Sequence, residues 1–375
     1  MTPNGTTPNG TTPTGTTPNG TTATITKPVP VRSAARPLRA GPLSLRITRR
    51  PLVATAGLAV AVFAVVMLSA FLGDFPLPAG DVLVALIGQG TSATNFVVLD
   101  LRLPRALCAV TIGAALGASG AAFQALTRNP LGSPDIIGLT SGAATGALLQ
   151  ILIIGGTALA VAGGAMFGGL ATAVIVYALA AGRGAVGYRL ILVGIGLNAM
   201  LWAVNWYLLI SANLQDAITA QVWLVGSLNG RSWPQLWPLL GLVAICLPLL
   251  MMASRPLGLL EMGDDAAKAL GVRAEKTRIV VVILAVLLAA GAVATAGPIA
   301  FVALAAPQLA KRLTGSVAVS VVPAALMGAF VLATSDIVAQ RLFAPAQLPV
   351  GVATGAVGGL YLVWLLLSEW KRDRG

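Results

Sequence analysis

Long runs of apolar residues, separated by short polar stretches, dominate the chain from residue 52 onward. A helix needs about 20 predominantly apolar residues to cross a bilayer. The pattern therefore predicts ten membrane-spanning helices, near residues 52–73, 105–126, 137–154, 158–181, 190–211, 235–253, 279–296, 299–313, 318–338 and 349–368. The third and eighth of these segments are short enough to be half-helices or re-entrant segments.

Composition supports this interpretation. Of the 375 residues 57% are hydrophobic and only 10% are charged, and the mean hydropathy is +0.87. A soluble domain carries roughly 25% charged residues, so lipid must cover much of this chain. The predicted fold class is all-α, a polytopic transmembrane helical bundle. Small residues at helical spacing, such as Gly113, Gly117 and Gly120, predict close packing of helix backbones.

The positions of the basic residues predict an orientation. If both termini are cytoplasmic, all but four of the 24 Lys and Arg residues lie on the cytoplasmic side, as the positive-inside bias requires. The four exceptions are Arg102, Arg105, Arg231 and Arg341. We therefore expect a multi-pass protein of the cytoplasmic (inner) membrane. The net charge of +12 is spread between apolar runs and does not indicate a nucleic-acid partner.

The N-terminal region has a different composition. Residues 1–22 repeat the sequence TTPNG with small variations, which predicts disorder because Pro and Asn-Gly break regular structure. Residues 24–50 are basic. The expected organisation is a disordered, low-complexity and then basic cytoplasmic tail over 1–50, a membrane domain over 51–370 and a short cytoplasmic tail over 371–375.

The sequence provides little for catalysis. It contains no histidine, its two cysteines lie in apolar runs, and none of its lysines follows a glycine as a phosphate-binding loop requires. We therefore expect no catalytic residue, no metal site and no cofactor. A membrane enzyme is disfavoured because a nucleophile–base set is missing. If ATP drives this protein, a separate subunit must bind it.

Three stretches are too polar or irregular to be explained by spanning alone. In LRLPR (101–105), Arg102 and Arg105 lie at the outer end of the second span, where they could reach the interface or form a dock for carboxylates. The stretch 124–142 contains Arg128, Asn129 and Pro130, and it predicts either a tight turn or a shaped cytoplasmic surface.

The third stretch, residues 255–276, is the only long polar segment between spans. Asp264 and Asp265 can cap and charge the start of a short helix, and Gly271 can end it. We expect this helix to lie along the cytoplasmic face, either as a passive interfacial helix or as a docking element for a cytosolic subunit.

Several motifs in this order resemble the FecCD-type permeases of ABC importers for iron-siderophore, haem and cobalamin. The resemblance extends from about Leu52 to the C-terminus and rests on these stretches: LRLPR (101–105), GAALGASGAAFQALTRNPLGSPDIIGLTSGA (113–143), LILVGIGLNA (190–199), WLVGSLNG (223–230), GLLEMGDDAAKALGV (258–272), AGPIAFVALAAPQLAKRLTG (296–315) and LPVGVATGAVGG (348–359).

The resemblance implies a type II ABC importer permease with about ten spans. It implies two copies of a cytosolic ATPase subunit, an extracytoplasmic solute-binding protein and a second permease, either the same chain or a homologue. The substrate it implies is a metal chelate, in the first place a ferric siderophore, with haem or cobalamin as the alternative. It also implies a coupling helix near 258–272, with these contact residues: Glu261, Met262, Gly263, Asp264, Asp265, Ala266, Ala267, Leu270 and Gly271.

Other roles follow from the same resemblance. Arg102 and Arg105 are expected to receive acidic residues of the binding protein. Where the family often has an arginine this chain has Gln340, and the neighbouring Arg341 is the candidate replacement. The family's usual histidine after Pro307 is Gln308 here, so protonation cannot be its role. Pathway or structural roles are assigned to Arg128, Asn129, Pro130, Asn198, Gly297, Pro298, Pro307 and Gln308.

A stand-alone secondary transporter is the alternative from a different class. Its support is the helix breaks expected around Gly297-Pro298 and Pro130, because discontinuous helices build substrate sites in such proteins. The lack of charged groups in mid-membrane argues against coupling to an ion gradient.

Overall fold

The computed structural model describes residues 36–40, 43–47, 49–73, 75–180, 186–316, 320–342 and 347–372. The chain divides into two units, Met1–Thr48 and Arg49–Gly375. In the first unit, strands β1 (Arg36–Ala40) and β2 (Leu43–Ile47) form an antiparallel hairpin, where a disordered tail was predicted, because their backbone groups pair with each other. The TTPNG repeat over 1–22 lies outside the described residues, so its predicted disorder stays a prediction.

All ten predicted spans are helical in the second unit, and the all-α prediction is confirmed for its described residues. The ten helices are α1 (Arg49–Phe71), α4 (Leu103–Thr127), α5 (Leu139–Leu149), α6 (Ala158–Ala180), α7 (Val186–Ser211), α9 (Trp233–Met252), α12 (Ala274–Ala296), α13 (Val302–Thr314), α14 (Val321–Arg341) and α15 (Val350–Arg372). Among the described residues, seven helical segments are long and apolar enough to cross a membrane.

The third and eighth spans are short, as predicted. Helix α5 reaches the length of a short span only with the π-helical turn η3 (Gln150–Ile154) that extends it. Helix α13 has 13 residues and begins three residues later than predicted. Its start is delayed because Gly297 and Phe301 have positive φ values of 79° and 68°, which break the chain out of helical geometry. The predicted helix break at Gly297-Pro298 is therefore confirmed.

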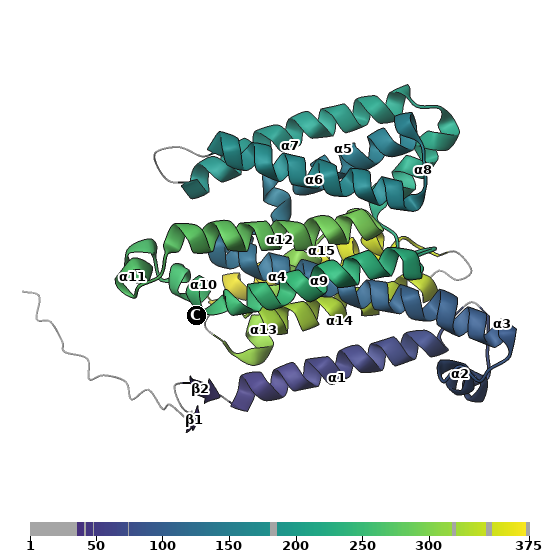
Figure 1. Ribbon diagram of the computed structural model, residues 1–375, viewed down its shortest axis with the longest axis horizontal. Coiled ribbons are helices and arrows are strands. Elements are labelled where there is room, and N and C mark those ends of the chain that lie inside the picture. The colour runs from purple at the N-terminus through teal and green to yellow at the C-terminus, as the bar shows by residue number, and fades with distance from the viewer. Residues whose placement is uncertain are drawn as a thin grey trace, which may run out of the picture. The chain divides into compact units, whose positions relative to one another are not determined.

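Successive long helices run in opposite directions, as Figure 1 shows. Helix α1 begins, and α15 finishes, at the end where α10 (Ser254–Glu261) and α11 (Asp264–Ala269) lie. We call this the α11 end. The opposite end carries α2 (Ala79–Leu86), α3 (Ser92–Asn95), the π-helical turn η1 (Phe96–Arg102) and α8 (Leu214–Val225), and we call it the α3 end.

The core of this unit lies around α4, α12 and α14, whose side chains are mostly buried. Helices α4 and α14 approach so closely that a Cβ at Gly113 would collide with the Gly328 carbonyl oxygen, and one at Gly117 with that of Ala324. Small residues thus allow the backbone contact that the glycine spacing predicted.

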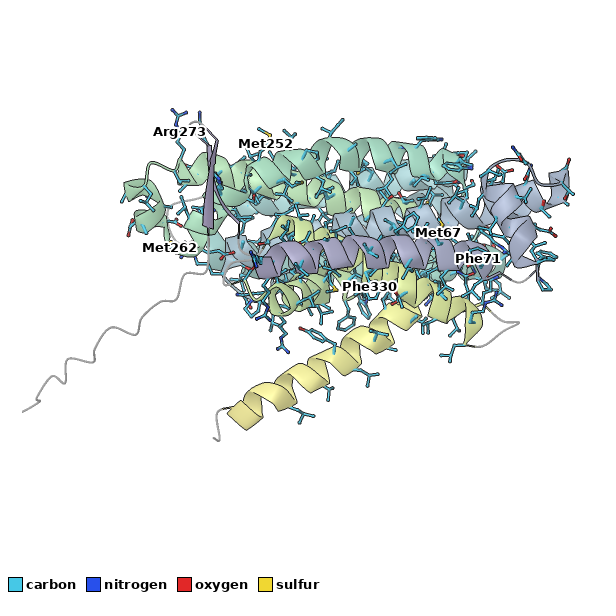
Figure 2. The ribbon with its side chains drawn as sticks, turned by 90° about the horizontal axis from the view of Figure 1, so that it is seen from below. Met67, Phe71, Met252, Met262, Arg273 and Phe330 are labelled. Carbon is cyan, nitrogen blue, oxygen red and sulfur yellow. The ribbon has the colours of Figure 1, made fainter. Side chains whose placement is uncertain are left out.

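Two long helices are peripheral. Helix α7 packs mainly on α5 and α6, and it exposes large apolar side chains such as Met200 and Ile210. Helix α15 diverges from the helices around α1, as Figure 2 shows, and exposes Leu360 and Val363. Lipid or another helical subunit must cover these faces.

Candidate functional site

A cluster of charged side chains joins three segments at the α11 end. The carboxylate of Asp264 accepts hydrogen bonds from Nη2 of Arg278 at 3.0 and 2.9 Å, and from Nη2 of Arg128 at 2.6 Å. Nε of Arg128 also donates to the Leu260 carbonyl at 3.0 Å. Asp264 therefore ties the start of α11 both to the end of α4 and to α12.

This arrangement corrects one detail of the sequence analysis. Gly263 is the N-cap of α11 and no side chain caps the helix, because the Asp264 carboxylate is engaged by the two arginines. Hydrogen bonds from Arg278 are the main reason why the pKa of Asp264 lies below its usual value. Both aspartates do lie in the first turn, where their charge favours the helix.

The predicted surface helix exists and offers a compact exposed surface. Ala267 is buried with Leu260 and Ala274, whereas Met262 and Leu270 are 70% and 62% exposed. Asp265, Ala269 and Gly271 are exposed as well, and Glu261, Gly263 and Ala266 are partly exposed. Met262 and Arg273 lie at the same end of the bundle in Figure 2. We call Met262 to Arg273 the α11 surface.

The connection after α4 forms the rest of this end. Arg128 ends α4 in the left-handed conformation, with φ 51°, and Asn129 Oδ1 accepts a hydrogen bond from the Leu131 amide at 2.9 Å. Arg128, Asn129 and Pro130 are all exposed. The predicted helix break here is confirmed, and the 3-10 turn η2 (Pro134–Ile137) leads into α5.

Polar side chains pair helices α5 and α7. Ser141 donates to Asn198 at 2.5 Å, while Thr145 donates to Oδ1 of Asn205 at 2.7 Å. Nδ2 of Asn205 returns a hydrogen bond to the Ser141 carbonyl at 3.2 Å. Asn198, assigned to the pathway or its support, therefore holds α7 against α5 in this structure.

A second set of polar contacts surrounds the break between α12 and α13. The Ala296 carbonyl accepts a hydrogen bond from the Ser227 amide at 2.8 Å, and a Cβ at Gly226 would collide with the carbonyl of Pro298. In α13, Pro307 is buried. Gln308 Nε2 donates to Gln124 Oε1 at 2.6 Å, so Gln308 acts as an uncharged link between α13 and α4.

The α3 end contains a buried ion pair. Arg105 donates through Nε and Nη2 to the Asp336 carboxylate at 3.0 and 2.9 Å, and through Nη1 to Gln347 Oε1 at 3.1 Å. The Asp336 side chain is 2% exposed and that of Arg105 is 14% exposed. Gln340 Nε2 also donates to Asp336, at 2.8 Å. Helices α4 and α14 and the approach to α15 are thereby joined.

Arg102 and Arg341 also contact the backbone at this end. Arg102 is 8% exposed and donates to the carbonyls of Ala70 and Phe75 at 2.8 and 2.5 Å. Arg341 donates to the Gly73 carbonyl at 2.6 Å, whereas Gln340 donates to Asp336, as expected for neighbours about 100° apart on a helix. Docking of a binding protein on Arg102, Arg105 and Arg341 stays a prediction, since all three guanidiniums already hold parts of this chain.

Two neighbouring clefts open beside this cluster. The first, of about 310 Å³, is lined by Arg102, Arg105, Gln340 and other residues. The second, of about 570 Å³, is lined by Trp223, Val222, Pro349 and others. Asn229, Arg231 and Gln347 line both. Arg231 received no predicted role, although its place among the four exceptions to the positive-inside bias was a usable signal.

Comparison with known proteins agrees with this architecture. Residues 59–368 match the FecCD transport family. The chain is 46% identical over 300 residues to the ferric enterobactin transport system permease protein FepG of Escherichia coli (strain K12), covering 80% of this chain and 91% of that protein. It is 37% identical over 311 residues to the probable siderophore transport system permease protein YfhA of Bacillus subtilis (strain 168), covering 81% and 91% of the two chains.

A solved structure shows the same fold. An inward-facing metal-chelate type ABC transporter superposes with a TM-score of 0.76 at 29% identity, covering 84% of this chain and 98% of that chain. The apolar helices and the two polar ends define a multi-pass membrane permease. The chain belongs to the FecCD transport family of ABC-transporter permeases.

Proposed function

We propose that this chain is the membrane subunit of an ATP-driven importer that carries a ferric siderophore across the cytoplasmic membrane. The α11 end, where α1 begins and α15 finishes, would face the cytoplasm, and the α3 end would face outward. The distribution of basic residues supports this orientation, because all but four of the 24 Lys and Arg residues would then be cytoplasmic.

The observation that carries the proposal is the Arg128–Asp264–Arg278 cluster. A subunit that pushes on the α11 surface acts on a segment linked to α4 through Arg128 and to α12 through Arg278. Helices α4 and α12 belong to the buried core, so movement of α11 is transmitted to the body of the bundle. A surface helix without such links could move freely and would transmit little work.

A ferric siderophore is favoured as the substrate because FepG and YfhA are named as ferric enterobactin and siderophore permeases. Haem or cobalamin is the alternative within the family. We further propose that α7 and α15 cover their exposed apolar faces against a second permease, either a copy or a homologue, with the pathway between the two subunits. An extracytoplasmic binding protein would deliver the chelate to the α3 end.

The test is uptake by the complete complex of this chain, its ATPases, its partner permease and its binding protein in proteoliposomes. Radioactive iron would be supplied as ferric enterobactin, as a ferric trihydroxamate and as haemin. We expect accumulation of an iron chelate that requires both hydrolysable ATP and the binding protein. Uptake that needs neither, and that follows an ion gradient, would refute the proposal in favour of a secondary transporter.

Asp264→Asn tests the coupling step. The side chains of Asp264, Arg128 and Arg278 are 38%, 46% and 29% exposed. Solvent screening therefore limits the free energy that these ion pairs contribute to the link to about 1 kcal/mol. We expect roughly a fivefold fall in substrate-stimulated ATP hydrolysis and uptake. Glu275→Gln, which removes an exposed acid at the same end, is the matched control and should leave both rates unchanged. Equal rates in the Asp264→Asn variant and the wild type would exclude this role.

A further inference from the structure

All four basic residues that violate the positive-inside bias converge at one place. Arg102, Arg105 and Arg231 line the first cleft at the α3 end, and Arg341 donates to the carbonyl of Gly73, which lines the same cleft. These residues come from η1, α4, the connection before α9, and α14. Four arginines that depart from the positive-inside bias at one site indicate that positive charge has a function there.

The described residues that line the two clefts offer no negative charge to Arg231. Asp336 pairs with Arg105, but none of the described residues that line either cleft is acidic. Nε of Arg231 donates to the Ser227 carbonyl at 3.4 Å, a long contact with a neutral group. Arg231 therefore presents a positive charge to both clefts.

Arg231 occupies the wall that the two clefts share, together with Asn229 and Gln347. Beyond this wall, the second cleft has apolar sides that include Val222 and Trp223. Its volume of about 570 Å³ lies within the range of small-molecule sites. A partly buried guanidinium between amide side chains and an aromatic wall suits an anion with an apolar body.

We propose that the second cleft binds the substrate as an anionic ferric chelate, with Arg231 as the residue that selects negative charge. Catecholate oxygens would accept hydrogen bonds from Arg231, and the aromatic rings would pack against Trp223 and Val222. This inference rests on the proposed function. An acidic side chain of the binding protein is a poorer occupant, because Arg231 is recessed between clefts whereas Arg341 stands exposed at the surface.

The test compares Arg231→Gln and Arg231→Lys with the wild type in the complete transporter, at saturating binding protein. The probes are ferric enterobactin, a triply negative tris-catecholate, and a neutral ferric trihydroxamate. For Arg231→Gln we expect roughly a tenfold fall in ferric enterobactin uptake per ATP hydrolysed, the size expected when a charge-assisted hydrogen bond is lost. Arg231→Lys keeps the charge but loses the fork geometry and should retain part of the uptake.

Binding of the binding protein to the permease is measured in parallel and should stay unchanged in both variants. A weaker complex with the binding protein would overturn the inference, since Arg231 would then serve docking. Equal losses in Arg231→Gln and Arg231→Lys would also overturn it, because geometry and not charge would matter, and so would no loss in either. If the wild type imports only the neutral chelate, the inference fails while the proposed function stands. If the wild type imports no chelate with ATP, both fail.

Discussion

Replacing Asp336 by Asn would leave the largely buried Arg105 guanidinium without its counter-charge. The two side chains are 2% and 14% exposed, and they form a two-pronged contact at 3.0 and 2.9 Å. Removing one partner of a buried pair typically costs about 3–5 kcal/mol. The Asn side chain keeps one acceptor oxygen for Arg105, so we expect the lower end of this range, about 3 kcal/mol.

The double variant Arg105→Met/Asp336→Leu removes both charges and replaces them with apolar side chains. Because desolvating two charges is itself costly, such replacements are often neutral or stabilising. We therefore expect the double variant to be more stable than either single variant, with a coupling energy of at least about 2 kcal/mol. The assay is denaturant unfolding in mixed micelles, followed by the fluorescence of the seven tryptophans.

Transport by the same variants separates two roles of Arg105. If its only role is to hold α4 against α14, uptake should recover together with stability in the double variant. If Arg105 also receives an acid of the binding protein, stability should recover while affinity for the binding protein does not. Additive losses in the two single variants, with no recovery of stability in the double variant, would refute the assigned energetics of the pair.

Two further predictions concern packing and pH. Gly113→Ala should destabilise the bundle by about 1–3 kcal/mol, because the added Cβ meets the Gly328 backbone of α14. In the control Gly241→Ala no atom lies within 4 Å of the added Cβ, so this variant should be neutral or stabilising in the same unfolding assay. The pKa of Asp264 is lowered in the folded protein. Its contribution to stability is therefore complete at a pH above its pKa in the unfolded chain, about 4, and is lost only as the pH falls through its pKa in the folded protein. As the sequence contains no histidine, we expect an unfolding midpoint that is constant between about pH 6 and 8, and a titration step in that window would contradict this account.

The long runs of apolar residues were sufficient to predict the membrane helices, because lipid requires every backbone polar group in a span to be satisfied within its own helix. This requirement acts on each segment separately, so the local sequence determines it. The helix breaks at Pro130 and at Gly297-Pro298 were equally local, since the backbone geometry of proline and glycine does not depend on the rest of the fold. The motif order was sufficient to identify the family.

The partners of the charged residues could not be predicted in the same way. The sequence did not show that Arg105 pairs with Asp336, which lies 231 positions later in the sequence; its docking role stays a prediction. Asp264 was expected to cap α11, but it binds Arg128 and Arg278. Helix propensities contain no information on which charges meet, because that depends on how separate helices pack against one another.

Arg231 shows both contributions together. The sequence by itself identified it as one of four arginines on the side where the positive-inside bias disfavours them. Only the tertiary structure decided that these four gather around neighbouring clefts, because their segments are brought together by the packing of α1, α4, α9 and α14. Charge placement relative to the membrane is a property of each segment, whereas a binding site is a property of several segments at once.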